Sequence, residues 1–136
     1  MAQRVEAAGT VVTILVSAGD IGIIEYQPKP GPAPGMMHHH TRESWSAYVL
    51  EGRTQIRLDD ETRELGPGDV VHVPRGRNFM WGEAAAGTRM LFVYTPGGFE
   101  RYFLEVAELF GTGKPLPELL PRIVELSETY GIERQS

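Results

Sequence analysis

The sequence predicts an all-β barrel or sandwich followed by two α-helices. Short apolar runs recur from residue 11 to residue 96, and glycine, proline or aspartate separates nearly all of them. After Pro96 the apolar residues recur at steps of three and four, which is the helical period. Strands this short and this regularly spaced are typical of barrels and sandwiches, so the helices must cover part of a β-structure.

Eight short segments have the composition of strands. They are 11–16, 21–27, 38–40, 45–50, 54–58, 69–74, 79–81 and 90–94. The connections between them carry turn residues, as in LEGR after Leu50 and LGPGD before Val70. The piece QPKPGPAPG at 27–35 cannot be a central strand, because proline has no amide hydrogen to donate. We expect a stiff connecting loop there rather than a polyproline ligand for a partner.

Two amphipathic helices are expected after residue 97. The first carries an aromatic-rich stripe and can end at Gly111; the stripe consists of Phe99, Tyr102, Phe103, Val106, Leu109 and Phe110. The second should begin near Pro121, which suits a first turn, and carry Ile123, Val124, Leu126 and Tyr130. The stripe could close a barrel mouth as a lid, pack along a sheet or form a dimer contact. We predict one domain over 1–136, with the barrel at about 8–96 and the helical extension at about 97–134.

Composition excludes several classes of partner. A length of 136 residues, 41% of them hydrophobic, suffices for one domain with a sizeable core. Thirteen Lys and Arg against eighteen Asp and Glu give a net charge of -5 without a basic run, so nucleic acid is a poor partner. The absence of cysteine excludes disulfides, iron–sulfur clusters and thiolate zinc sites. No apolar segment has the length of a secretory core or a membrane span, so we expect a cytoplasmic protein.

Three of the four histidines are adjacent, in the stretch GMMHHHTRESWSAYVLEG at 35–52. On a strand, alternation would put His38 and His40 on one face and His39 on the other. Two imidazoles on one face suit either a metal site or proton transfer near neutral pH.

Two spacing motifs resemble those of the cupin superfamily, and in particular of its single-domain members that are similar to quercetin dioxygenase. In the first, His38 and His40 lie fourteen and twelve residues before Gly52. The second lies in GPGDVVHVPRGRNF at 66–79, where Gly68, Pro74 and Gly76 hold the family's spacing. The segments YTPGGFERYF and YGIE are also similar to that subgroup. The resemblance implies a double-stranded β-helix, or jelly roll, that forms a homodimer.

The resemblance also implies a metal held by four side chains. In this chain the four positions are occupied by His38, His40, Trp45 and Phe79. Catalytic first-row metals commonly need three protein ligands, so we expect no metal cofactor. Glu43 or His72 could still complete a substitute site with the two histidines for iron, nickel, manganese, copper or zinc. Otherwise Glu43 is a solvated turn carboxylate or an orienting partner for an imidazole, and His72 faces the wet side of a strand.

Aromatic residues should surround the two histidines instead. Alternation puts Trp45 on one strand face with Ala47 and Val49, and Phe79 on one face with Trp81. Such a wall suits a flat or polyunsaturated small molecule. The candidate substrate-binding residues are Trp45, Ala47, Tyr48, Phe79, Trp81 and Arg89, with Tyr48 and Arg89 as polar contributors.

Three functions agree with these features. The first is a metal-independent enzyme of natural-product biosynthesis, in which His38 and His40 are catalytic and move protons in the cyclisation, isomerisation or dehydration of an aromatic or polyketide-like compound. The second is a metal-dependent, quercetinase-like dioxygenase that uses both histidines and a substitute ligand. The third is a non-catalytic cupin that binds a small molecule, with the aromatic residues serving as packing. The substrate and the stereochemistry stay open.

Overall fold

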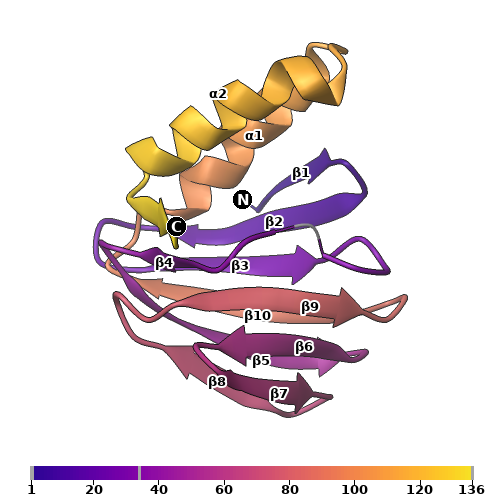
Figure 1. Ribbon diagram of the computed structural model, residues 1–136, viewed down its shortest axis with the longest axis vertical. Coiled ribbons are helices and arrows are strands. Elements are labelled where there is room, and N and C mark those ends of the chain that lie inside the picture. The colour runs from indigo at the N-terminus through magenta and orange to yellow at the C-terminus, as the bar shows by residue number, and fades with distance from the viewer. Residues whose placement is uncertain (1, 34, 136) are drawn as a thin grey trace.

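The computed structural model describes residues 2–33 and 35–135. Within them, eleven strands form two antiparallel sheets (Figure 1). Two helices follow the tenth strand in the sequence and precede the eleventh, which is the last strand. The six-stranded sheet has the order β1 (Gln3–Ala7), β2 (Thr10–Ser17), β3 (Gly22–Gln27), β10 (Arg89–Thr95), β5 (Ser44–Glu51) and β8 (Val70–Val73). The five-stranded sheet has the order β11 (Ile132–Arg134), β4 (His38–His40), β9 (Phe79–Ala84), β6 (Thr54–Leu58) and β7 (Glu61–Leu65). This is the mostly β fold with two C-terminal helices that the sequence predicts.

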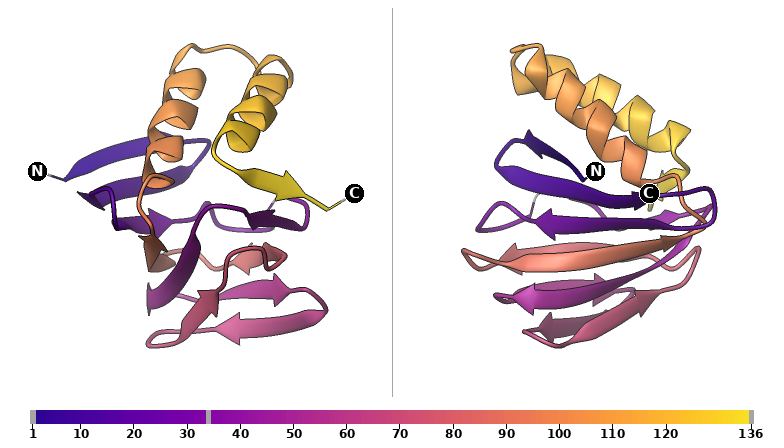
Figure 2. Two further views of the ribbon diagram at one scale, coloured as in Figure 1. Left: turned by 90° about the vertical axis from the view of Figure 1, so that its left-hand side faces the viewer. Right: turned by 180° about the vertical axis from the view of Figure 1, so that it is seen from behind.

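The core lies between the inner faces of the two sheets. Alternate residues of a strand point inward, as in β5, where Trp45 and Ala47 are buried and Tyr48 is exposed. Ile56 and Leu58 of the five-stranded sheet are fully buried in the same cluster. Figure 2 shows the strands stacked around this interior, with the helices at one end of the stack.

All eight predicted strand segments are strands of the structure, with bounds that differ by no more than three residues. Three further strands were not predicted. The side chains of β1 and β7 are mostly exposed, and β11 has only three residues, so none shows enough apolar alternation to indicate a strand. The sheets therefore extend beyond the predicted barrel limits of about 8 and 96 at both ends. The proline-rich segment connects β3 to β4 over its described residues; Pro34 lies outside them.

The two helices are α1 (Glu100–Gly111) and α2 (Leu116–Thr129). The first ends at Gly111, as predicted. The second begins five residues before Pro121, with Pro117 in its first turn and Pro121 inside the helix. The predicted start was wrong because two prolines could occupy a first turn, and burial of Leu119 favours the earlier one. Neither helix, within the described chain, is long and apolar enough to cross a membrane.

The aromatic stripe of α1 packs against the inner face of the six-stranded sheet at its β1–β3 edge. The ring of Phe103 lies 5.9 Å from that of Tyr26, and Tyr26 stacks on Phe92 of β10 at 4.7 Å. Both Tyr26 and Phe92 belong to the interior cluster. The helix therefore covers one end of the barrel rather than its outer surface.

A buried carboxylate holds α1 in this position. Glu100, the first residue of the helix, is 1% exposed, accepts a hydrogen bond from Ser17 Oγ at 2.6 Å and accepts another from the Gly98 amide at 2.7 Å. A Cβ atom on Gly22 would lie 2.1 Å from Glu100 Oε1, so the carboxylate occupies the space that a side chain would need. The β2–β3 connection is thus tied to the start of α1, and with it to Phe99.

Candidate functional site

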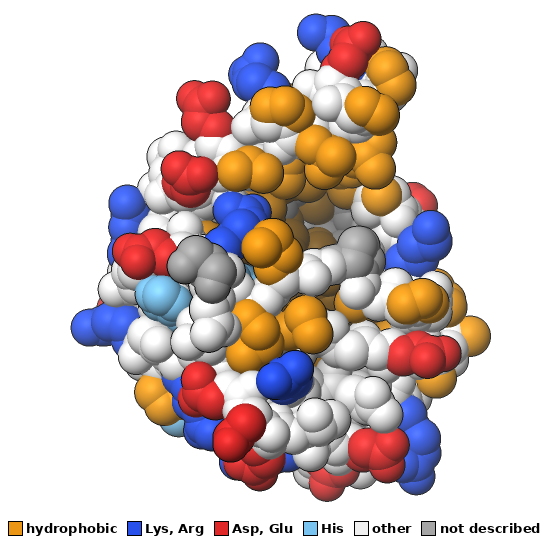
Figure 3. Space-filling view, in the orientation of Figure 1, with side chains coloured by type: hydrophobic (Ala, Val, Ile, Leu, Met, Phe, Trp, Pro, Cys, Tyr) orange, Lys and Arg blue, Asp and Glu red, His pale blue; other side chains and the backbone are white. Residues whose placement is uncertain are grey.

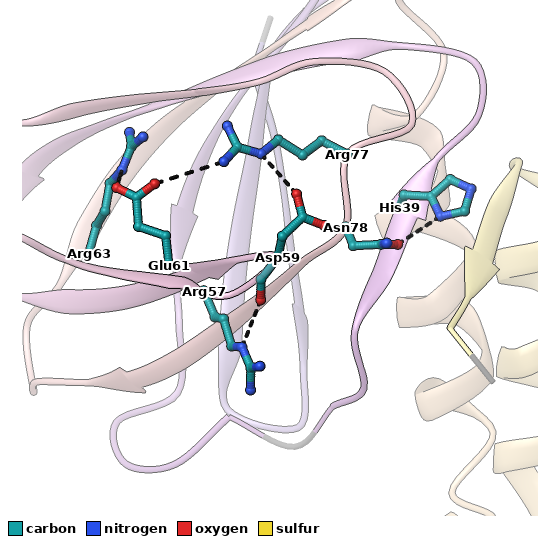
Figure 4. A network of polar contacts seen from close by, with 7 residues as sticks. All are labelled: His39, Arg57, Asp59, Glu61, Arg63, Arg77 and Asn78. Atoms are coloured by element: carbon teal, nitrogen blue, oxygen red, sulfur yellow. Dashed lines mark hydrogen bonds and ion pairs between the residues drawn. The ribbon is translucent and has the colours of Figure 1, made fainter.

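Strand β4 places two imidazoles on the inner face of the five-stranded sheet. Their ring centroids are 6.2 Å apart; His40 is 5% exposed, and His38 is half-buried nearer the rim. The intervening His39 faces the opposite side, where its Nδ1 donates to Asn78 Oδ1 at 3.0 Å at the end of a surface network of polar residues (Figure 4). The predicted division of the three histidines is therefore correct.

His40 is paired with a buried carboxylate. Its Nδ1 donates a hydrogen bond to Oε1 of Glu43, which is only 4% exposed. The bend between them is held by Thr41, whose amide and hydroxyl both donate to the Gly131 carbonyl oxygen, at 2.9 and 2.7 Å. Glu43 is thus the orienting partner of an imidazole and not a solvated turn residue.

His38 is oriented by the backbone instead. Its Nδ1 donates to the carbonyl oxygen of Met36 at 2.8 Å. Burial lowers the pKa of His38 below the ordinary value of 6.5, and the nearby His40 and Arg134 act in the same direction, against the effect of the Met36 hydrogen bond. His38 is therefore neutral at pH 7, with Nε2 as the nitrogen that can accept a proton.

Aromatic rings surround the two histidines. The ring centroid of Phe79 lies 4.3 Å from that of His38 and 5.6 Å from that of His40. The ring of Phe99 is edge-on to His40, with a centroid distance of 4.5 Å. Trp45 is 6.1 Å from His40 and 5.9 Å from Trp81. The structure thus brings together the predicted aromatic residues and adds Phe99, which the sequence suggested only as part of a helical stripe.

Tyr94 is another neighbour of the site that the sequence analysis missed. It is buried on β10, with its ring 6.2 Å from His40 and 5.3 Å from Phe99. The alternation of Met90, Phe92 and Tyr94 along β10 is the signal that could have found it.

The indole nitrogen of Trp45 has no acceptor. Trp45 is 3% exposed, and its Nε1 makes no hydrogen bond to any described residue. A buried donor left without a partner costs about 1–3 kcal/mol, so a core tryptophan normally satisfies it. Among the described residues, this nitrogen is the fully buried side-chain nitrogen that folding leaves without a hydrogen-bond partner.

Tyr48 and Arg89 lie outside this cluster, contrary to prediction. Tyr48 is 44% exposed on the outer face of β5, because it alternates with the inward Trp45 and Ala47. Arg89 pairs on the outer side with Glu25 at 2.5 Å. Strand parity alone would have excluded both, and we remove them from the candidate site.

The sequence matches the model of a protein family. The model of the family described as "Cupin domain" matches residues 22–95, which include β3 to β10 and both interior histidines. The chain is a cupin.

This cupin is distantly similar to several characterised or solved proteins. It is 33% identical to quercetin 2,3-dioxygenase from Bacillus subtilis over 66 residues, which are 48% of this chain and only 20% of that enzyme. Among solved structures, KdgF from Halomonas sp. has a TM-score of 0.63 and 23% identity, covering 72% of this chain and 87% of that one. Pac13 from Streptomyces, a nucleoside dehydratase, has a TM-score of 0.59 and 18% identity, covering 74% of this chain and 80% of that one. At such identities the structures show a common fold.

The interior of this cupin does not fit the usual three- or four-ligand metal site. The carboxylate of Glu43 is engaged by His40 Nδ1. His72 lies on the outer face of β8, hydrogen-bonded to Ser46 Oγ at 2.8 Å. The described part of the chain contains no group of three or more His, Cys, Asp or Glu side chains that could hold a metal ion.

Two hollows lie beside the helices of this cupin. One, of about 170 Å³, separates α1 from the inner face of β1–β3. The other, of about 420 Å³, lies between α1 and α2 and has a mixed polar lining. In the aromatic cluster itself, rings pack directly on His40, which is 5% exposed.

Proposed function

We propose that this cupin is a metal-independent enzyme that moves protons on a small planar molecule by means of His38 and His40. The observation that carries the proposal is the matched orientation of the two rings. Each Nδ1 donates to an oxygen, of Met36 in one case and of Glu43 in the other, so each ring keeps Nε2 for a substrate. Two such groups on one strand face can take a proton from one atom and give a proton to another.

Dehydration illustrates the division of labour. His38, neutral at pH 7, takes a proton from carbon through Nε2. His40 gives a proton from Nε2 to the departing hydroxyl group, while its Nδ1 stays bonded to the Glu43 carboxylate. The C–H electron pair becomes the new C=C bond, and water leaves. Isomerisation needs the same two transfers, with the second proton delivered to carbon.

The surroundings of the histidines support an unsaturated substrate. Two of the four metal positions that the sequence resemblance assigns hold Trp45 and Phe79, and both rings lie close to His40. Ala47, fully buried beside Trp45 on β5, adds no polar group. The fold is shared with a nucleoside dehydratase, which makes dehydration the first reaction and uridine the first compound to test.

The test is an assay in deuterium oxide, read by mass spectrometry. Uridine, quercetin and a panel of hydroxylated aromatic and polyketide-like compounds are incubated with the untagged protein. Loss of water or gain of deuterium at carbon is the expected result, and it should fall at least 100-fold in His38→Gln and His40→Asn. Turnover that survives both substitutions would contradict the proposal. Binding without any mass change would favour a non-catalytic cupin.

A substitution at Trp45 tests what its unmatched nitrogen does. We expect a substrate oxygen to accept from Nε1, so Trp45→Phe should lower kcat/KM by about 10- to 100-fold. The loss of ring volume and the removal of an unmatched buried donor should nearly cancel, so that the unfolding free energy changes by about 1 kcal/mol or less. Chemical denaturation measures the second quantity. Unchanged kcat/KM, or a large loss of stability, would assign Trp45 to packing alone.

The lowered pKa of His38 predicts a pH dependence that needs no substrate. The unfolded chain binds a proton at His38 near pH 6.5, whereas the folded protein binds it only at lower pH. The contribution of His38 to stability is therefore complete above pH 6.5 and is lost as the pH falls through the lowered pKa. Between about pH 7.5 and pH 5, wild type should lose more unfolding free energy than His38→Gln. Equal losses would contradict a buried, neutral His38.

The second candidate is a metal-dependent dioxygenase. The 33% identity to quercetin 2,3-dioxygenase over 66 residues favours it. It requires Glu43 to leave His40 Nδ1, or His72 to leave the outer face, and to join both imidazoles on one ion. Elemental analysis of untagged protein decides between the two: near-stoichiometric iron, nickel, manganese, copper or zinc that disappears in His38→Ala would support the dioxygenase. The predicted homodimer is tested by light scattering on the same samples.

A further inference from the structure

The hollow between α1 and the β1–β3 edge has the features of a second ligand site. Its wall on the sheet side consists of Val5, Ala7, Thr10, Val12 and Tyr26. Its wall on the helix side consists of Tyr102, Phe103, Val106 and Phe110. Figure 3 shows a recess edged by hydrophobic side chains below the helices. None of the lining residues is charged, and the histidine pair is not among them.

The size and lining of the hollow indicate one aromatic ring. Its volume of about 170 Å³ is close to that of apolar cavities of about 150 Å³ that take up benzene. Four of the nine lining residues carry aromatic rings, two of them tyrosines. Aromatic side chains on both walls can contact a flat ligand by offset stacking on one side and edge-on packing on the other. A flexible aliphatic chain gains less from such walls.

The polar side chains that line the hollow indicate which substituent the ligand's aromatic ring should carry. Among the lining residues, three have polar side chains, and each of these carries a hydroxyl group: Thr10, Tyr26 and Tyr102. Burial raises the pKa of Tyr26 to about 12, although the neighbouring Thr10 side chain acts in the opposite direction. Tyr26 is therefore neutral and carries a proton that it can donate. A hydroxyl group on the ligand is well matched, whereas a carboxylate would lose its hydration without gaining a cation.

We propose that this hollow binds a phenol-like, single-ring compound, with its ring between α1 and β1–β3 and its hydroxyl group at Tyr26. The site does not depend on proton transfer by the histidines. It is coupled to them by contact, because Phe103 lies edge-on to Phe99 at 5.6 Å and Phe99 lies edge-on to His40 at 4.5 Å. A ligand that moves α1 should therefore also change the packing of Phe99 on His40.

Titration of the full-length protein with phenol and with toluene, followed by methyl NMR of Val5, Val12 and Val106, tests the proposal. Both compounds should bind and shift these signals. Val106→Phe fills the hollow and should weaken both at least 10-fold. The matched control, Val124→Phe on the exposed face of α2, should leave both affinities within twofold of wild type. Ala7→Leu fills the hollow from the opposite wall and serves if Val106→Phe does not fold.

The hydroxyl contact has its own control. Tyr26→Phe should weaken phenol about 3- to 10-fold, the usual value of one hydrogen bond, and leave toluene unchanged. Several outcomes overturn the proposal: no binding of either compound up to its solubility, equal affinities in Val106→Phe and wild type, or tighter binding of n-hexanol than of phenol. A dimer that dissociates in Val106→Phe would show that a second copy occupies the hollow, and would also overturn it.

Discussion

Replacing Glu43 by alanine should destabilise the fold by about 3–5 kcal/mol and abolish proton transfer at His40. The carboxylate and the imidazole are both buried and are bonded to each other, so removal of one leaves the other without its partner. Glu43→Gln keeps an oxygen acceptor for Nδ1 but removes the negative charge. It should retain most of the stability and lower kcat by about 10²- to 10⁴-fold, because an imidazolium at His40 loses its counter-charge.

The control for Glu43 is an acidic residue of similar chemistry on the surface. Glu61 pairs with Arg63 at 2.9 Å, and both side chains are about half exposed. Glu61→Ala should leave the unfolding free energy nearly unchanged, because an exposed ion pair contributes little to stability. Chemical denaturation of both variants measures the difference. A similar small effect for Glu43→Ala would mean that His40 does not need its carboxylate to fold.

Gly97→Ala should destabilise the fold by about 3 kcal/mol or more. A Cβ atom at this position would lie 2.1 Å from the carbonyl oxygen of Ala18 and 2.7 Å from that of Ile21. Both are backbone atoms of the β2–β3 turn, which is closed by the bond from the Ala18 amide to the Ile21 oxygen at 2.9 Å. To relieve the overlap, either the backbone at position 97 or that of the β2–β3 turn must move. A loss of unfolding free energy of this size is expected when an interior is overpacked.

The effect of Gly97→Ala should also reach the candidate site. Gly97 lies two residues before Phe99, whose ring contacts His40 at 4.5 Å. The matched control is Gly111→Ala at the end of α1, where, among the described residues and apart from the adjoining residues and the backbone of the helix itself, nothing lies within 4 Å of the added Cβ atom. That change should be neutral or stabilising by up to about 1 kcal/mol, since alanine is the better helix former. Thermal unfolding compares the two, and equal melting temperatures would contradict the predicted overlap.

Much of the candidate site follows from strand alternation. The run of three histidines is a strand, so His38 and His40 share its inner face while His39 faces outward. The same rule places Trp45 and Ala47 inside and should have placed Tyr48 outside. The errors at Tyr48 and Arg89 arose because residues were chosen for their chemistry without regard to their parity along the strand.

Outside the strands, where side chains no longer alternate between two faces, the sequence does not determine which side chains point inward. Glu43 follows β4 in a bend, and a bend does not determine whether a side chain points to solvent or to the core. That direction is set by contact with a distant part of the chain, since Thr41 is bonded to the carbonyl oxygen of Gly131. The start of α2 was ambiguous for a related reason, because the choice between Pro117 and Pro121 depends on the burial of Leu119.

The all-β barrel with its helical extension could be predicted from the amino-acid sequence, and so could two imidazoles and several aromatic rings that face one interior. These are consequences of local periodicity, which depends on neighbours one to four positions away. Three features required the folded structure: Glu43 orients His40, Phe99 and Tyr94 complete the cluster, and a hollow remains between α1 and β1–β3. Those features depend on segments that are far apart in the chain, such as Val5 and Phe110 on the two walls of the hollow or Thr41 and Gly131 in one hydrogen bond, and no local pattern predicts such contacts.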